Sequence, residues 1–280
     1  MNENSRQKNS PRRVLAKPVF SDAGLEFLST SYTGTRAEPS FQDEPVRSVR
    51  NIRVKNSNQN FMHPKKQVTA TRLVNFYGYD FIITPDVLIP RPETEMMVDM
   101  VLSLAGKSYL PGVKPGKAVL PEDMTIQDVG TGSGCIAVTL KLELPKASVV
   151  ATDISKKALT VARRNAKRLG AKIEFRQADL LDGIETQPDL VVANLPYVDD
   201  NWEWIDKEAL GKEPSLALYA EDGGLALIKR LIDQVTERGI RHLVLEADPC
   251  QHERIAMYAE EKGLMINQTR GFILHLATDT

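Results

Sequence analysis

The sequence predicts an α/β protein whose main domain is a sheet of seven mostly parallel strands with helices on both faces. Segments typical of strands and of helices alternate from Thr125 onward, a pattern that indicates a parallel sheet covered by helices. A glycine-rich turn joins the first of these strands to its helix. The chain has 280 residues, 42% of them hydrophobic and 26% charged, which is enough for one large domain and a smaller piece.

The first 72 residues differ in composition from the rest of the chain. Residues 1–72 hold 13 Lys and Arg against 6 Asp and Glu, whereas residues 73–280 hold 23 against 31. Hydrophobic periodicity is poor in this basic stretch, so we expect an atypical N-terminal region. Its composition fits an organellar targeting segment, a solvated tail or an anion-binding arm.

Other compositional features narrow the class of protein. Cys135 and Cys250 are too few for a disulfide framework and lack the spacing of a zinc site. No apolar run is long enough to span a membrane, and the first residues lack the apolar core of a secretory signal. We therefore expect a cytoplasmic protein with no metal site.

A β-hairpin is expected at about residues 73–83, because apolar and polar residues alternate on either side of Gly78. Pro92 is suited to the first position of the helix that follows. A stretch rich in Gly, Pro and Lys then leads to the next unit. We expect residues 73–120 to form the hairpin, a proline-rich segment and a linking helix, and residues 121–280 to form the sheet domain.

The sheet domain is expected to alternate strands with helices. One helix follows the glycine turn, a second is capped by Ser155 and ends at Gly170, and a third occupies about residues 224–238. The expected strands are at about residues 125–128, 149–153, 173–177, 189–194, 242–246, 265–268 and 272–277.

The glycine-rich turn indicates a nucleotide-like ligand. It contains Gly130, Gly132 and Gly134, more glycines than a tight turn requires, and it precedes a helix N-terminus with unpaired N–H groups. Asp153 ends the second strand, where a carboxylate is placed to accept hydrogen bonds from the two ribose hydroxyls of an adenosine. These features alone suit a dinucleotide as well as other adenosine cofactors.

The tetrapeptide Asn194-Leu195-Pro196-Tyr197 follows the fourth strand at the carboxyl edge of the sheet. The Asn194 side chain and the Leu195 backbone offer two carbonyl acceptors, Pro196 stiffens the turn, and Tyr197 offers a flat ring. This set suits a planar NH2 group whose two hydrogens point at the two acceptors. Accepting both hydrogen bonds returns electron density to a poorly nucleophilic nitrogen, which favours methyl transfer over hydride transfer.

These motifs together resemble one enzyme family. The run Leu88 to Glu95 (LIPRPETE), the glycine turn, Asp153 and the tetrapeptide are similar to those of the peptide chain release factor glutamine methyltransferases, and so are the phrases that begin at Glu213 and at Asp222. The resemblance covers about residues 74–277. It implies a Rossmann-like domain that uses S-adenosylmethionine to methylate the side-chain nitrogen of the glutamine in a release factor's Gly-Gly-Gln loop.

The resemblance also implies roles for particular residues. Asn194, Pro196 and Tyr197 would be catalytic. Substrate would be held by Asn194, Leu195, Pro196 and Tyr197, with Arg91 and Glu93 in the wall between the small and large domains. The cofactor would be held by Asp128, Gly130, Thr131, Gly132, Ser133, Gly134, Asp153, Asp179, Leu180 and Asn194. Of these, Asp179 matches the place where such enzymes contact the adenine, and Leu180 follows it.

The chain departs from the family pattern at two places, and other functions stay open. Leu195 stands where the family usually has Pro, which gives the NLPY of the rRNA adenine dimethyltransferases, and residues 1–66 do not match the helical domain with which the family docks its release factor. The alternatives are an N6-adenine methyltransferase acting on RNA or DNA and a non-catalytic binding module. LIPRPETE and the net negative charge of residues 73–280 favour a release factor over nucleic acid as the partner. We expect a monomer.

Overall fold

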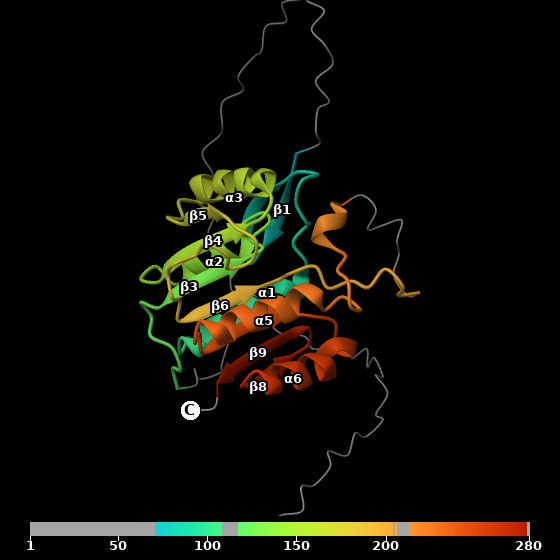
Figure 1. The fold of residues 1–280 in the computed structure, drawn as a ribbon. Coiled ribbons are helices and arrows are strands. Elements are labelled where there is room, and N and C mark those ends of the chain that lie inside the picture. The colour runs from blue at the N-terminus through green and yellow to red at the C-terminus, as the bar shows by residue number, and fades with distance from the viewer. Residues whose placement is uncertain (1–70, 108–116, 204, 206–212, 279–280) are drawn as a thin grey trace, which may run out of the picture. The chain divides into compact units, whose positions relative to one another are not determined.

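A seven-stranded sheet forms the centre of the computed structural model, which describes residues 71–107, 117–203, 205 and 213–278 (Figure 1). The strand order is β5-β4-β3-β6-β7-β9-β8. The first five strands are parallel, and β9 runs antiparallel to both of its neighbours. The strands are β3 (Thr125–Val129), β4 (Ser148–Asp153), β5 (Glu174–Gln177), β6 (Leu190–Ala193), β7 (His242–Glu246), β8 (Leu264–Arg270) and β9 (Ile273–Thr278). The prediction of a seven-stranded, mostly parallel sheet is confirmed.

Helices cover both faces of the sheet. Alternate residues of one strand divide between two apolar cores: Val192 of β6 packs in one, whereas Val191 and Ala193 pack in the other. This alternation is expected of a strand that is buried on both faces. The first core contains α1 (Pro92–Leu104), α2 (Cys135–Glu143) and part of α3 (Lys156–Leu169), and the second contains α5 (Ala226–Glu237) and α6 (His252–Glu261).

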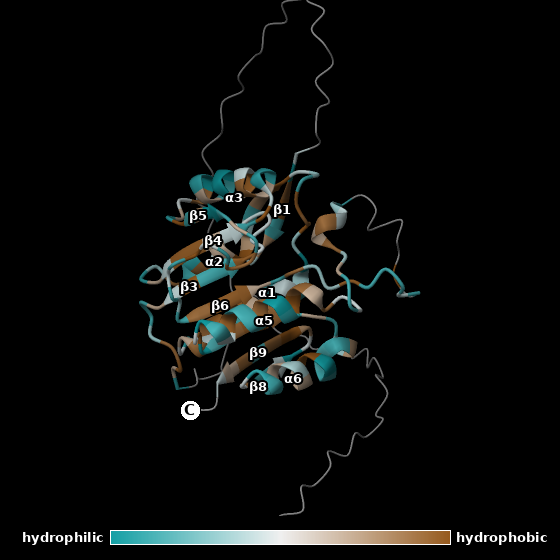
Figure 2. Cartoon of the chain, viewed as in Figure 1, coloured by the Kyte–Doolittle hydropathy of each residue, from teal (hydrophilic) through white to brown (hydrophobic). Residues whose placement is uncertain are grey.

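The helix α3 forms as the sequence predicts. The Ser155 side chain accepts a hydrogen bond from the Ala158 N–H at 3.2 Å, and Gly170 ends the helix with φ of 77°. Its apolar stripe is buried, and its outer face is hydrophilic (Figure 2). Although the segment is polar on average, its apolar residues recur at the spacing of one helix face, and burial of that face stabilises the helix.

The helix α6 was not predicted. Only two of its side chains, Ile255 and Ala259, are buried, so its apolar stripe is too narrow to be recognised in the sequence. Its start is specified by polar residues: Asp248 and Gln251 form a capping box around the short 3₁₀ turn Pro249–Gln251. Tertiary packing on β8 and α5, rather than sequence periodicity, accounts for this helix.

The predicted hairpin consists of β1 (Arg72–Phe76) and β2 (Tyr79–Ile83), paired antiparallel around Tyr77 and Gly78, both with positive φ. Asn165 of α3 attaches it to the sheet domain. Its side chain accepts from the Ile82 N–H at 2.7 Å and donates to the carbonyl oxygens of Ile82 and Ser133 at 2.9 Å each. The hairpin is thereby tied to the glycine turn.

The N-terminal prediction, residues 1–72, lies almost entirely outside the described residues, as does most of the expected linker after α1. Among the helices that are described, none has the length and apolar character to cross a membrane.

Candidate active site

A pocket of about 260 Å³ opens at the carboxyl edge of β3, β4 and β6. The glycine turn follows β3, Asp153 ends β4, and Asn194 follows β6. In parallel sheets of this topology, ligands bind where the strand order reverses, at the carboxyl ends. The pocket therefore lies where the sequence places both of its candidate motifs, and most of the predicted site residues line it.

The glycine turn exposes backbone to this pocket. All three glycines have positive φ, between 55° and 81°. A Cβ on Gly134 would approach the Cβ of Ala162 to 3.0 Å, and one on Gly130 would approach the Leu195 side chain to 2.9 Å. A Cβ on Gly132 would instead meet only the Gly130 carbonyl oxygen, at 3.9 Å. Gly130 and Gly134 are thus required for packing, whereas Gly132 leaves its backbone open to a ligand. Thr131 and Ser133 also line the pocket.

Asp128 lies behind the turn rather than in the pocket wall. Its carboxyl group is fully buried and accepts a hydrogen bond from the Thr131 hydroxyl at 2.6 Å. Burial raises its pKa to about 7, against the lowering effect of that hydrogen bond. In this structure Asp128 braces the glycine turn, and its expected part in holding the cofactor stays a prediction.

Asp153 is held in the wall by backbone donors. Its Oδ2 accepts from the Gly132 N–H at 2.9 Å and its Oδ1 from the Ser155 N–H at 2.8 Å. Burial raises its pKa, while these two bonds oppose the rise. Since each carboxylate oxygen has a second lone pair, both can still accept from hydroxyl groups. This carboxylate and the open glycine backbone suit the ribose of an adenosine.

Asp179 and Leu180 line the same pocket after β5. Asp179 is partly exposed and pairs with Arg230 of α5 at 2.9 Å. Leu180 is buried and adopts a positive φ of 53°, which is unusual for a leucine. The strained backbone turns the chain along the pocket at the point where the resemblance expects the adenine.

The tetrapeptide divides between the pocket and the layer behind it. Asn194, Leu195 and Pro196 line the pocket. Tyr197 does not, because its hydroxyl turns away to donate to Glu246 Oε1 at 3.0 Å. Burial raises the pKa of Tyr197, and the Glu246 carboxylate adds to the rise, so this hydroxyl stays protonated. The structure thus places the tyrosine as a support for the tetrapeptide.

Two residues that the sequence did not predict lie against Asn194. Its side-chain NH2 donates to the Thr94 hydroxyl at 3.1 Å, and that hydroxyl donates to Glu246 Oε2 at 2.7 Å. Thr94 and Glu246 are each only 2% exposed. Burial raises the pKa of Glu246, and the hydrogen bonds from Thr94, Tyr197 and Asn194 lower it. Glu246 ends β7 beside the end of β6, so the strand-end rule could have identified it.

Arg91 and Glu93 have different surroundings. Arg91 lines the pocket and pairs with Glu213 at 2.5 Å, and Glu213 also accepts from the Ile89 N–H at 2.9 Å. This ion pair joins the LIPRPETE run to the phrase that begins at Glu213. Glu93 is exposed in the first turn of α1, outside the pocket wall. The helix dipole alone explains an acidic residue at that place, and the expected role of Glu93 in the wall between the two domains stays a prediction.

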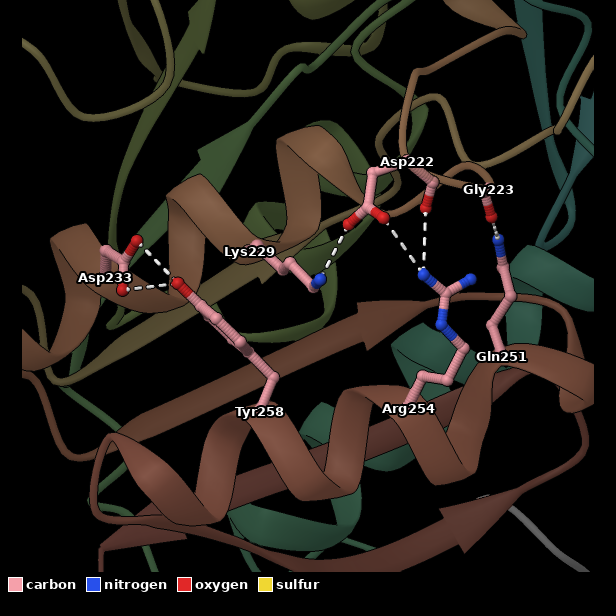
Figure 3. A network of polar contacts seen from close by, with 7 residues as sticks. All are labelled: Asp222, Gly223, Lys229, Asp233, Gln251, Arg254 and Tyr258. Atoms are coloured by element: carbon pink, nitrogen blue, oxygen red, sulfur yellow. Dashed lines mark hydrogen bonds and ion pairs between the residues drawn. The ribbon is translucent and has the colours of Figure 1, made fainter.

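A polar network joins the loop at Asp222 and Gly223 to α5, to α6 and to Gln251 (Figure 3). The Gln251 side chain donates to the carbonyl oxygens of Tyr197 and Gly223, both at 2.8 Å. Asp222 pairs with Lys229 at 2.6 Å and with Arg254 at 3.0 Å, which connects the same loop to α5 and α6. Gly224 leaves no room for a side chain, since a Cβ there would lie 1.9 Å from the Tyr197 carbonyl oxygen. The tetrapeptide backbone is therefore clamped.

Two other kinds of site, a metal centre and a reactive cysteine, have little support in the described part of the chain. No group of three or more His, Cys, Asp or Glu side chains comes together there in a way that could hold a metal ion. Burial raises the pKa of Cys135 to about 12, so its thiol is a poor nucleophile at neutral pH.

Comparison with known proteins identifies the family. Residues 117–210 match the model of the methyltransferase small domain. The chain is 36% identical over 245 residues to the release factor glutamine methyltransferase of Bacillus subtilis, covering 84% of this chain and 76% of that protein. It is 44% identical over 177 residues to that of Koribacter versatilis, covering 62% and 58%, and 42% identical over 161 residues to that of Enterococcus faecalis, covering 57% and 53%.

Solved structures share the fold at low sequence identity. The T. thermophilus 16S rRNA N2 G1207 methyltransferase, in complex with AdoMet and guanosine, aligns with a TM-score of 0.55 at 14% identity, covering 78% of this chain and 52% of that chain. The hMettl16 catalytic domain, in complex with a MAT2A 3′UTR hairpin, aligns with a TM-score of 0.53 at 19% identity, covering 72% and 76%. These likenesses show a Rossmann-like methyltransferase fold.

The chain spans little more than half the length of several of these relatives, 58% and 53% in the Koribacter and Enterococcus proteins. Its match to the Bacillus protein nevertheless extends over three quarters of that protein. The chain therefore belongs to the release factor glutamine methyltransferase family.

Proposed function

We propose that this protein transfers a methyl group from S-adenosylmethionine to the side-chain amide nitrogen of the glutamine in the Gly-Gly-Gln loop of a peptide chain release factor. The observation that carries the proposal is the position of Asn194. Its side chain stands in the wall of a pocket that also contains Asp153 and the open Gly132 backbone. An acceptor for an NH2 group and a site for an adenosine cofactor thus share one pocket.

The residues present fit the cofactor. Gly132 leaves its backbone accessible, Asp153 keeps free lone pairs for the ribose hydroxyls, and Asp179 and Leu180 lie at the expected adenine end. When bound, S-adenosylmethionine supplies an electrophilic methyl group on a sulfonium. Gly132 and Asp153 at the strand ends would hold the adenosine part of the ligand, in the same pocket as Asn194.

The tetrapeptide would orient and activate the incoming amide. The Asn194 side-chain oxygen and the Leu195 carbonyl accept one N–H each, which fixes the nitrogen in the pocket and returns electron density to it. Fixed orientation supplies the proximity contribution to the rate. The nitrogen loses its proton after the methyl group has been transferred, so no strong base is needed beside it.

Leu195 takes the place where the family usually has proline. Its side chain is buried, and it lies close to the site of a Cβ on Gly130. The leucine therefore packs the tetrapeptide against the cofactor turn. We propose that this packing, together with Gln251 behind Tyr197, replaces the stiffness that a second proline would give.

A protein partner is favoured over nucleic acid. The loop that follows the tetrapeptide carries Asp199, Asp200 and Glu203, and a phosphate backbone would be repelled there. A release factor acts in translation, which places the proposed enzyme in the cytoplasm, and we expect it to act as a monomer.

The deciding experiment is methyl transfer from labelled S-adenosylmethionine to a purified release factor, to rRNA and to DNA in parallel. We expect label only in the release factor, with one added methyl group on the glutamine of its Gly-Gly-Gln peptide by mass spectrometry. Label confined to nucleic acid would establish the adenine methyltransferase alternative instead. Binding of a release factor without any transfer would indicate the non-catalytic module.

A further inference from the structure

Two buried polar side chains and one partly buried side chain form a series of hydrogen bonds that ends at the pocket. Glu246 ends β7, Thr94 lies in the first turn of α1, and Asn194 follows β6. The Asn194 NH2 donates to Thr94 Oγ1 at 3.1 Å, and the Thr94 hydroxyl donates to Glu246 Oε2 at 2.7 Å. Asn194 and Thr94 both line the pocket, whereas Glu246 lies behind them and is not part of the pocket wall.

The donors and acceptors of these groups give the series of hydrogen bonds a single direction. The Thr94 hydroxyl has one hydrogen, and it donates that hydrogen to Glu246 Oε2. The lone pairs of that hydroxyl are then the groups available to Asn194. Asn194 must therefore present its NH2 side to Thr94, which turns its oxygen to the opposite side.

Tyr197 reinforces this arrangement. Its hydroxyl has one hydrogen, which it donates to the other oxygen of Glu246 at 3.0 Å. The Asn194 NH2 also faces Glu246 closely enough to lower the pKa of that carboxyl. All three neighbours thus present hydrogens to the carboxylate, and a reversed Asn194 amide would place its oxygen against an acceptor instead.

We propose that Thr94 and Glu246 are positioning residues that fix the side-chain amide of Asn194 with its oxygen toward the pocket. This inference rests on the proposed function, in which that oxygen accepts an N–H of the substrate glutamine. Without Thr94 the amide can rotate by half a turn and present a donor to the substrate NH2. A donor facing a donor removes the hydrogen bond that activates the nitrogen, so the effect falls on transfer rather than on binding of the cofactor.

The test compares T94V with T94S and a matched control. Valine has the shape of threonine without the hydroxyl, whereas serine keeps the hydroxyl. We expect T94V to lower kcat by about tenfold to a hundredfold, with KM for the release factor and the Kd of S-adenosylhomocysteine changed less than about threefold. T94S keeps kcat within about threefold of the wild type.

T139V is the control. Thr139 of α2 is as deeply buried as Thr94, but its hydroxyl has no hydrogen-bond partner among the described residues. The same substitution there should leave kcat unchanged. E246Q is a second variant: glutamine has the size of glutamate but carries hydrogens on one side, so it no longer fixes the direction of the series, and kcat should fall as in T94V.

Equal kcat for T94V and the wild type would overturn the inference, and so would a T94V defect that T94S shares or that appears in KM or cofactor binding alone. The orientation of Asn194 is also measurable without activity. In protein labelled with ¹⁵N at asparagine, the Asn194 side-chain hydrogens should exchange slowly in the wild type, T94S and T139V, and rapidly in T94V. Unchanged exchange in T94V contradicts the inference. A wild type that methylates no release factor overturns the proposed function, while this exchange measurement still decides the orientation.

Discussion

The two walls of the pocket are built in different ways. The cofactor wall consists mainly of backbone from one local segment, the glycine turn, supported by Asp128 and Asp153 at the ends of adjacent strands. The acceptor wall consists of Asn194 and Thr94, with Glu246 behind them, and these side chains are far apart in the sequence: Thr94 is 100 residues from Asn194 and 152 residues from Glu246. The first wall is a local motif, and the second exists only in the folded chain.

This difference suggests that one wall serves cofactor binding and the other serves methyl transfer. The glycine turn is expected to bind the cofactor through its backbone N–H groups. Its glycines have positive φ, so few other residues fit there. A wall of buried polar side chains fixes the direction of one hydrogen bond, because each buried donor and acceptor must find its partner. Variants on the two walls should therefore fail in different measurements, and the following predictions test that separation.

The largest effect is expected at the acceptor wall, from N194A. The alanine removes the acceptor for the substrate amide, so single-turnover transfer should fall by about a hundredfold to a thousandfold. The Kd of S-adenosylhomocysteine, measured by calorimetry, should stay within about threefold of the wild type. If the cofactor affinity of N194A falls as far as its transfer rate, the two walls do not act separately.

The next effect is expected at the cofactor wall, from D153A. This change removes the acceptor for the ribose and also frees the Gly132 N–H, so the Kd of S-adenosylhomocysteine should rise by about tenfold to a hundredfold. At saturating cofactor, kcat should remain within about threefold of the wild type. D153N, which keeps one acceptor oxygen, should lie between the two. A large loss of kcat with intact affinity would contradict the comparison.

The sequence brought the glycine turn and Asp153 together at one strand edge because their signals are local; their binding of the cofactor stays a prediction. A strand end, three glycines and a following helix lie within a few residues, and Asp153 follows at a distance set by one helix and one strand. The seven strands were predicted for the same reason, since buried parallel strands are short apolar runs between turns. The tetrapeptide was recognised by its composition, although the outward turn of Tyr197 was not.

The missed features are those that depend on long-range packing. Thr94 belongs to a run whose acidic neighbours suggested a helix start, and nothing in its local sequence shows that it reaches Asn194. Glu246 would have been found by asking which residue ends each strand beside β6. Glu93 was expected in the wall because its run is distinctive, yet helix geometry turns it outward and its neighbour Thr94 inward. The direction of a side chain on a helix is fixed only once the helix is packed.

A smaller effect is expected at the ion pair of Arg91 and Glu213, of which Arg91 lines the pocket. Glu213 is nearly buried and Arg91 is partly exposed, so solvent screens the attraction between the two charges only in part. R91A and E213A should each raise KM for the release factor by about threefold to tenfold, because the pair holds the Arg91 side chain in the pocket wall. The double variant should be no worse than E213A alone. Additive effects would show that the two residues act separately.

The smallest effect on transfer is expected far from both walls, at the pair His242 and His275. His275 Nε2 lies 3.2 Å from His242 Nδ1, between β9 and β7, and burial together with the His242 charge lowers the pKa of His275 to about 4. Burial and Arg241 lower the pKa of His242, and Asp189 opposes them. Between about pH 6.5 and about pH 4, His275 therefore binds a proton in the unfolded chain but not in the folded chain.

The sign of the pH dependence follows from that difference in bound protons. The contribution of His275 to stability is complete above about pH 6.5 and is lost as the pH falls toward about 4. H275Q keeps a side chain that can form hydrogen bonds but does not titrate, so the wild type should lose about 1–3 kcal/mol more than H275Q over this range in urea unfolding. Equal losses would place the acid sensitivity elsewhere. At neutral pH, transfer by H275Q should match the wild type, because this pair touches neither wall of the pocket.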